Sequence, residues 1–326
     1  MPLIRVPKPW HLPESRITSE SSYRSRRRFL KQLAGAGMGI AAASILGDRP
    51  SRSALVGDST TVAPENYVPN ADFTDTGLTP TAESLVSRYN NFYEFGNSKT
   101  IWRKAQALPT DDWKVEVTGL VQNPKIYDLD SLRRQFPLEE RVYRFRCVEA
   151  WAMVVPWLGF PMRLMLEDVQ PTAEAKFVRF QSFYDPAITT GPFWPPSASL
   201  PWPYTEGLRL DEMANELAFF ALGTYGKDLP KQNGAPIRMV VPWKYGFKGA
   251  KSIVKIEFVT EQPATYWNTL APSEYAFESN VNPAVPHPRW SQAEERLVGD
   301  GPAWGWTRQP TLPYNGYAEY VAHLYA

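Results

Sequence analysis

Cys147 is the only cysteine among the 326 residues, and it ends an alternating segment that begins at Val142. Arg144 and Arg146 belong to the same segment, and nearby positive charge lowers the pKa of a thiol toward the thiolate that binds metals. A lone cysteine cannot form an intrachain disulfide, a four-cysteine zinc site or a cysteine-ligated iron–sulfur cluster. Cys147 is therefore a candidate ligand of a single metal ion. The alternative is a small buried apolar residue.

Two later segments combine glycine with basic residues. Residues 232–238 open a predicted strand, and residues 243–251 connect that strand to the next one. The glycines expose backbone N–H groups, while Arg238, Lys248 and Lys251 supply cations, a combination that binds a phosphate without a Walker motif. The alternative is a basic, solvent-exposed hairpin.

A third candidate segment, residues 89–96, has the sequence YNNFYEFG. Its amide and aromatic side chains suit hydrogen bonding to a planar heterocycle. The alternative is core packing, which is the commoner role of aromatic runs.

Other classes of site are disfavoured by what the sequence lacks. It contains no GxGxxG, GxxxxGK[ST], HExxH or GxSxG motif, which disfavours nucleotide-binding folds, zincins and the common serine hydrolases. A cysteine–histidine hydrolase would need His287 or His323 as its base, and nothing in the sequence orients either one. No uninterrupted apolar run reaches the roughly 20 residues of a membrane-spanning helix.

The N-terminal region has the pattern of an export signal. Residues 25–31 read SRRRFLK and precede a mildly apolar run rich in Ala and Gly, which resembles a twin-arginine signal. We expect residues 1–54 to be a signal peptide that directs the folded protein to the periplasm. The alternative is an amphipathic or membrane-anchoring helix. Residues 1–54 contribute 10 of the 35 basic and 3 of the 34 acidic residues, so the remaining chain has a net charge of −6 and gives no reason to expect nucleic-acid binding.

The remaining chain is predicted to form one sheet-dominated α+β domain. Residues 55–80 are typical of a linker or extended arm, and we expect order in residues 81–326. Short helices are predicted at 131–134, capped by Asp128 or Asp130, and at 160–168. Alternation and enrichment in Val, Ile, Phe and Tyr predict strands at 113–120, 142–147, 176–183, 216–223, 236–241 and 252–259.

Several runs along the chain are similar to one enzyme family. They include RFRCVEAW at 144–151, MVVPW at 153–157, and Asn282-Pro283 followed by HPRWSQ at 287–292. Together with the loops around Asn233 and Gly246, these runs resemble the catalytic subunits of periplasmic protein-methionine-sulfoxide reductases, the MsrP or YedY family. The resemblance extends over nearly the whole chain.

The resemblance implies the sulfite-oxidase fold and a Mo-molybdopterin cofactor with one molybdenum and one pterin. Residues 81–326 would be the molybdopterin-binding catalytic domain, with the Cys147 thiolate as the only protein ligand of the metal. Ser182 stands where the family usually has threonine, and Ala250 where it has a larger aliphatic residue. Matching positions imply these cofactor-binding residues: Asn90, Tyr93, Glu94, Cys147, Ser182, Asn233, Arg238, Gly249, Ala250 and Lys251.

The implied reaction is oxygen-atom transfer from methionine sulfoxide in oxidised periplasmic proteins, with electrons from the quinone pool through a haem-containing membrane subunit. Glu149, two residues after the ligand, is a catalytic candidate that positions water or relays a proton. The alternative is that Glu149 is a structural partner of Arg144 or Arg146. Reduction of small S- or N-oxides, sulfite oxidation, and an exported binding module without catalysis stay open as alternatives. We expect a monomeric catalytic subunit because no dimerisation segment is visible.

Overall fold

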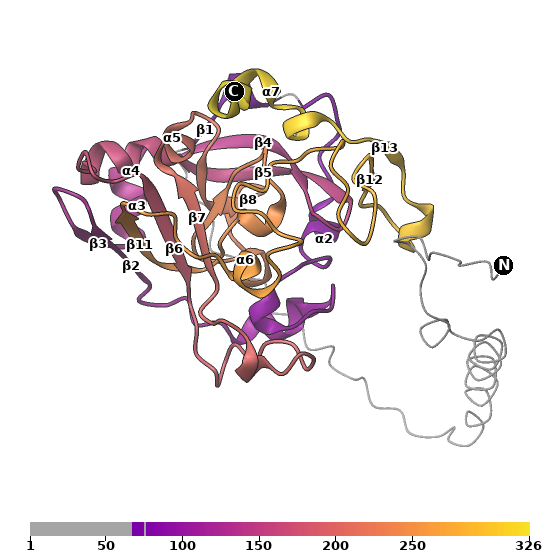
Figure 1. Ribbon diagram of the computed structural model, residues 1–326, viewed down its shortest axis with the longest axis horizontal. Coiled ribbons are helices and arrows are strands. Elements are labelled where there is room, and N and C mark those ends of the chain that lie inside the picture. Colours follow the sequence, from indigo (N-terminus) through magenta and orange to yellow (C-terminus); the bar gives the residue numbers. More distant parts are fainter. Residues whose placement is uncertain (1–66, 75) are drawn as a thin grey trace, which may run out of the picture. The chain divides into compact units, whose positions relative to one another are not determined.

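Two β-sheets, of eight and five strands, form the framework of the described part of the protein (Figure 1). The computed structural model describes residues 67–74 and 76–326, and these belong to one compact unit. The predicted signal peptide, residues 1–54, lies outside the described residues. None of the helices within them has the length and apolar character needed to cross a membrane.

The long strand β5 (Trp151–Pro161) organises the eight-stranded sheet. One edge of β5 pairs antiparallel with β4 (Glu139–Arg146). The other edge pairs with β12 (Glu294–Leu297), parallel, near its start and with β8 (Phe219–Thr224), antiparallel, near its end. The outer strands are β1 (Val68–Pro69) on β4, β9 (Lys227–Asp228) and β10 (Arg238–Val240) on β8, and β13 (Arg308–Pro310) on β12.

Every residue of β5 is buried, which explains why its sequence shows no alternation. Because a uniformly apolar run does not reveal a strand by its period, β5 was not predicted. The helix predicted at 160–168 is α4 (Met162–Val169), and Phe160 and Pro161 belong to β5 instead.

The five-stranded sheet has the order β3 (Lys125–Asp128), β2 (Lys114–Gly119), β11 (Ile253–Val259), β6 (Phe177–Ser182) and β7 (Thr205–Arg209). Neighbours are antiparallel except for β2 and β11. In β6 buried and partly exposed residues alternate, as expected for a strand with one face on the core. The six predicted strands are confirmed as β2, β4, β6, β8, β10 and β11.

The helices are short. Helix α3 (Leu129–Gln135) begins after Asp128, whose carboxylate accepts from the Ser131 N–H at 2.6 Å, so Asp128 is the N-cap. Besides α4, the other α-helices in residues 67–74 and 76–326 are α2 (Glu83–Val86), α5 (Leu210–Ala214), α6 (Tyr266–Leu270) and α7 (Ala318–Val321).

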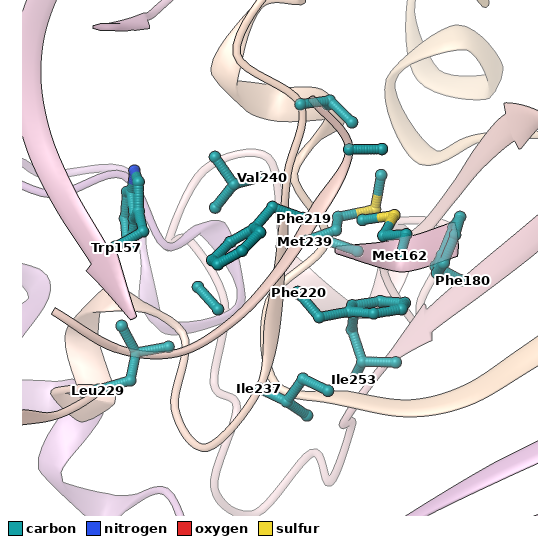
Figure 2. Packing of buried hydrophobic residues seen from close by; sticks show 14 of the residues in the cluster. Trp157, Met162, Phe180, Phe219, Phe220, Leu229, Ile237, Met239, Val240 and Ile253 are labelled. Atoms are coloured by element: carbon teal, nitrogen blue, oxygen red, sulfur yellow. The ribbon is translucent and has the colours of Figure 1, made fainter. Parts of the chain in front are cut away.

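One hydrophobic core joins the two sheets (Figure 2). Phe220 of β8 packs against Phe180 of β6, with ring centroids 6.2 Å apart, and Met162 of α4 is buried in the same cluster. This shared core holds the ends of β4, β5, β10 and β11 in place. The candidate site forms at these strand ends. The predicted sheet-dominated α+β class is confirmed.

Part of the predicted arm at 55–80 lies within the described residues. There β1 pairs parallel with β4, and the Phe73 ring lies 5.8 Å from the Tyr143 ring. This stretch is therefore attached to the eight-stranded sheet.

Candidate functional site

A cavity of about 390 Å³ lies among the β4–β5 hairpin, residues 86–99 and the loop after β10. Seven of the predicted site residues line it, namely Asn90, Tyr93, Cys147, Glu149, Asn233, Arg238 and Lys251. Four others, Glu94, Ser182, Gly249 and Ala250, are packed behind its wall. The structure thus brings together segments that are more than 150 residues apart in the sequence.

Cys147 begins the turn between β4 and β5. The Cys147 N–H donates to the Trp151 carbonyl at 2.9 Å, and the Ala150 N–H donates to the Cys147 carbonyl at 3.0 Å. Ala150 has a φ of 64°, the left-handed conformation that closes the turn. The thiol is buried and receives the Asn91 side-chain amide at 3.5 Å and the Glu149 N–H at 3.4 Å.

Burial raises the pKa of the Cys147 thiol to about 12, and the negative charge of Glu149 adds to this effect. Lys99 and Arg146 oppose the shift less strongly. The predicted lowering of this pKa is therefore not found in the structure. A metal that binds here must displace the thiol proton, because only the thiolate is a ligand.

The turn is held from behind by residues that follow in and around β12. Arg146 is fully buried, donates to the Cys147 carbonyl, and forms an ion pair with Glu295 at 3.0 Å. The carbonyl of Val148 accepts from the Gln292 side-chain amide at 2.7 Å. These contacts fix the backbone that carries the thiol.

Glu149 pairs with Lys99, and neither Arg144 nor Arg146 contacts its carboxylate. Its Oε2 accepts from Lys99 Nζ, from Asn91 Nδ2 at 2.9 Å and from Trp151 Nε1 at 3.0 Å. Burial alone would raise the pKa of Glu149, but Lys99 and these hydrogen bonds outweigh it and lower the pKa to about 2. Sequence reasoning missed Lys99, because nothing local indicates a contact across 50 residues.

The other end of the cavity is cationic. Arg238 is buried and donates to the Asn233 carbonyl at 2.9 Å, and burial lowers its pKa to about 10. Lys251 Nζ lies 5.1 Å from the centre of the Phe92 ring and forms no ion pair with a described carboxylate. Burial lowers the pKa of Lys251 to about 8, with Glu94 opposing the shift.

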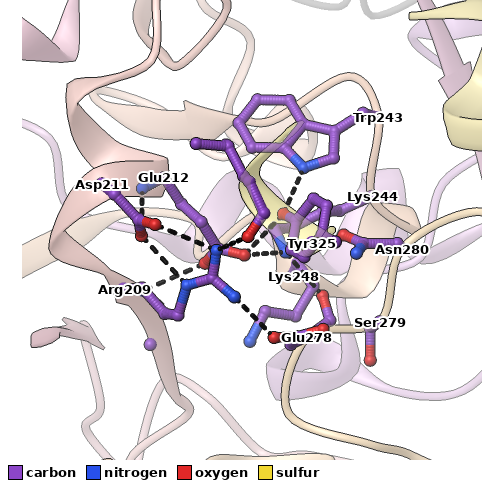
Figure 3. A network of polar contacts seen from close by, with 12 residues as sticks. Arg209, Asp211, Glu212, Trp243, Lys244, Lys248, Glu278, Ser279, Asn280 and Tyr325 are labelled. Atoms are coloured by element: carbon purple, nitrogen blue, oxygen red, sulfur yellow. Dashed lines mark hydrogen bonds and ion pairs between the residues drawn. The ribbon is translucent and has the colours of Figure 1, made fainter. Parts of the chain in front are cut away.

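Lys248, which the sequence suggested as a phosphate-binding cation, does not contribute to this end of the cavity. It is buried in an ion pair with Glu206 at 2.7 Å. The neighbouring Lys244 is likewise paired with Glu212 at 2.5 Å, in a polar network that also includes Tyr325 (Figure 3). This network supports the loop that contributes Gly246 and Phe247 to the cavity wall.

The four residues behind the wall have structural contacts. A Cβ on Gly249 would lie 2.9 Å from Arg238 Nη2, so glycine allows the guanidinium to approach the backbone closely. The N–H of Ala250 donates to the Lys248 carbonyl at 3.1 Å. Glu94 is fully buried beside Ser182, and burial raises its pKa.

Aromatic residues line the rest of the cavity, notably Trp267, Tyr275 and Trp290. His287 stacks on Trp290 with ring centroids 3.8 Å apart, and its Nε2 lies 3.4 Å from Glu274. Neither His287 nor His323 lines the cavity that contains the thiol. The structure therefore does not pair Cys147 with a histidine base.

Four buried polar atoms on the cavity wall find no hydrogen-bond partner among the described residues: Asn90 Oδ1, Trp157 Nε1, Asn233 Oδ1 and Arg238 Nη2. Each unpaired buried group costs about 1–3 kcal/mol. A ligand with donors, acceptors and an anionic end would satisfy them. A pterin with a phosphate has this chemistry, so the residues present fit a molybdopterin with its metal at Cys147.

A family profile and a known relative agree with this chemistry. The profile of the oxidoreductase molybdopterin-binding domain matches residues 103–267. The protein-methionine-sulfoxide reductase catalytic subunit MsrP of Burkholderia mallei is 48% identical over 319 residues, which cover 96% of this chain and 93% of the relative. Among solved structures, the sulfane dehydrogenase SoxCD of Paracoccus pantotrophus matches 61% of this chain and 46% of its own, with 16% identity and a TM-score of 0.42.

The profile match spans half of the chain, and the likeness to the Burkholderia enzyme spans almost all of it. Both lead to one class of enzyme and exclude the binding module without catalysis. The chain belongs to the molybdopterin-binding oxidoreductases and, within them, to the family of protein-methionine-sulfoxide reductase catalytic subunits.

Proposed function

We propose that this protein reduces methionine sulfoxide residues of periplasmic proteins at a molybdenum held by Cys147. The observation that carries the proposal is the two-ended cavity. A lone buried thiol lies at one end, and at the other lie two cations that form no ion pair with a described residue. Such a cavity suits one elongated ligand that binds through a metal at one end and a phosphate at the other.

In this proposal Arg238 and Lys251 bind the phosphate, and Asn90 and Asn233 hydrogen-bond the pterin. Tyr93 also lines this part of the cavity. When bound, the molybdenum group supplies two-electron oxygen-atom transfer from a sulfoxide. Glu94, Ser182, Gly249 and Ala250 support these contacts from behind the wall.

Beside the thiol, Glu149 stays ionised because Lys99 and Asn91 hold its Oε2. At neutral pH Glu149 therefore accepts hydrogen bonds as a carboxylate. Glu149 Oε1 makes no hydrogen bond to a described residue and is free to position water next to Cys147. The aromatic wall excludes bulk water and accommodates the methyl and methylene groups of the oxidised side chain.

We also propose that the twin-arginine signal exports the folded enzyme and that a haem-containing membrane subunit supplies electrons from the quinone pool. The name of the Burkholderia relative, a catalytic subunit, supports a partner subunit. Membranes containing that subunit should support sulfoxide reduction with quinol as the donor, and an inhibitor of quinol oxidation should stop it.

The first test compares the wild-type enzyme with Cys147→Ser, both made in cells that synthesise the cofactor. Wild type should contain about one molybdenum per chain and reduce an oxidised, unfolded protein with an artificial electron donor. Loss of a residue that only supports a metal ligand costs up to about 100-fold in affinity or activity, so loss of the ligand itself should cost more. Full activity and metal content in Cys147→Ser would refute the assignment.

Small sulfoxides and sulfite are the alternative substrates. The ratio of kcat/KM for an oxidised unfolded protein to that for dimethyl sulfoxide separates repair of proteins from reduction of small oxides. Sulfite-dependent reduction of an electron acceptor at a higher kcat/KM than either would instead favour a sulfite-oxidising enzyme.

A further inference from the structure

Arg289 lies at the rim of the cavity, and its guanidinium is fixed from two sides. Its Nη2 donates to Glu274 Oε2 at 2.6 Å, and its Cζ lies 4.8 Å from the centre of the Trp290 ring. The side chain is nevertheless 58% exposed. Arg289 therefore presents an ordered cation to solvent at the cavity entrance.

Trp290 connects this cation to the turn that carries the thiol. Its Nε1 donates to the carbonyl of Val148, the residue after Cys147, at 2.7 Å. Arg289 and Trp290 both line the cavity. A cavity of about 390 Å³ that also holds a cofactor admits a side chain, and the backbone of a polypeptide substrate must stay at the rim.

Most of the hydrogen-bonding capacity of Arg289 is unused. A guanidinium has five N–H donors, and among the described residues the side chain of Arg289 donates only to Glu274. Peptide carbonyl oxygens are acceptors that every polypeptide presents, whatever its sequence. A small sulfoxide has no such group beyond the one that reacts.

We propose that Arg289 donates hydrogen bonds to backbone carbonyl oxygens next to the oxidised methionine and so determines the preference for polypeptides over small sulfoxides. This inference rests on the proposed function. Glu274 and Trp290 act as positioning residues that hold the guanidinium in place before the substrate binds.

The experiment compares molybdenum-loaded wild type with Arg289→Met on two substrates. One is a blocked pentapeptide with a single methionine sulfoxide among glycines, and the other is dimethyl sulfoxide. We expect KM for the peptide to rise about tenfold at unchanged kcat, equivalent to ~1.4 kcal/mol, while kcat/KM for dimethyl sulfoxide changes less than twofold. Arg289→Lys keeps the charge but not the planar fork of donors. Its KM for the peptide should therefore lie between those of wild type and Arg289→Met.

Arg308→Met is the matched control. Arg308 is 62% exposed and pairs with Glu294 at 3.8 Å, but it does not line the cavity. Its replacement removes the same charge and should leave kcat/KM for both substrates unchanged. Binding of the peptide to the oxidised enzyme can be measured without an electron donor. It should be weaker than wild type in Arg289→Met and unchanged in Arg308→Met.

Three results overturn the inference. They are equal losses on both substrates in Arg289→Met, no loss on either, or the same peptide effect in Arg308→Met. Wild-type enzyme that contains molybdenum and reduces neither substrate overturns the proposed function itself, and the inference with it.

Discussion

Lys251 and Arg238 place two positive charges in a buried space where no described carboxylate pairs with Lys251. Burial lowers the pKa of both side chains, to about 8 for Lys251 and about 10 for Arg238. The two positive charges therefore destabilise the cofactor-free protein at this end of the cavity. An anion that binds there offsets this cost, which couples loading of the cofactor to stability.

Replacement of Lys251 with methionine should have opposite effects on the two forms of the protein. Between pH 8 and 10.5 the unfolded chain holds a proton on Lys251 that the folded, cofactor-free protein has lost. The free energy of unfolding of the cofactor-free wild type therefore rises with pH in this range. Cofactor-free Lys251→Met should therefore be more stable than wild type at pH 7, and its advantage should vanish by about pH 10.5. In the loaded protein Lys251→Met should be the less stable variant.

Thermal unfolding of both forms from pH 7 to 10.5 measures this crossover. Lys255→Met is the control, because Lys255 is partly exposed and pairs with Glu116 at 3.5 Å on the outside of the sheet. A cofactor-free Lys251→Met that is less stable than wild type at pH 7 would show that the lysine has a stabilising partner.

At the scale of elements, the β4–β5 hairpin and β12 act as one unit. Strand β12 pairs with only two residues of β5, Trp151 and Ala152. Side chains complete the connection, because the ion pair between Arg146 and Glu295 spans the same junction with both partners buried. Breaking that ion pair affects the hairpin turn, whose first residue is Cys147.

Arg146→Met should destabilise the protein far more than Arg144→Met. The first change leaves the carboxylate of Glu295, which is 3% exposed, without its cation, a loss of about 3–5 kcal/mol. Arg144 is only partly buried and its side chain donates to the Thr76 carbonyl at 2.7 Å, so its loss should cost about 1 kcal/mol. Denaturant unfolding measures both, and a cost below 1 kcal/mol for Arg146→Met would contradict this account.

Strands with one buried face were predictable from alternation. Of the strands buried at every residue, β8 and β10 were predicted from their apolar composition, and β5 was not. The alternation in β2, β6 and β11 reflects the side each residue faces. In β5 both faces are covered, so no period remains in its sequence. Short edge strands such as β9 and β13 have too few residues to show a pattern.

The same limit applies to the candidate site. Cys147 and Glu149 were candidates from the sequence because one is the only cysteine and the other lies two residues after it. The partners of Glu149, Asn91 and Lys99, come from a distant segment, and only the fold brings them near. The sequence marked Arg289 only as part of a family motif, because its place at the rim of the cavity depends on the fold.

At the scale of the whole molecule, the placement of methionine suits an enzyme that works among oxidants. All five methionines in residues 76–326 are at most 4% exposed, namely Met153, Met162, Met165, Met213 and Met239. The described surface therefore offers no methionine that would compete with the proposed substrates. Met153 lines the cavity and, at 4% exposure, is the most exposed of the five.

Native enzyme treated with hydrogen peroxide should gain little oxygen at these five positions. In urea all five should be oxidised, because unfolding exposes their sulfur atoms. Mass spectrometry of peptides from both samples measures the difference, and Met153 in cofactor-free protein should react before the other four. Rapid native oxidation at Met162 or Met213, which have no exposed surface, would contradict the burial described here.

The network in Figure 3 has a consequence for the time at which one loop of the cavity wall gains its contacts. Tyr325 donates to Glu212 at 2.6 Å and accepts from Trp243 at 2.8 Å, beneath the loop that forms part of the wall. While a ribosome is still making the chain, its exit tunnel keeps the newest residues away from the folded part. The loop therefore gains these contacts only after Tyr325 has left the tunnel, later than contacts among the residues that precede it.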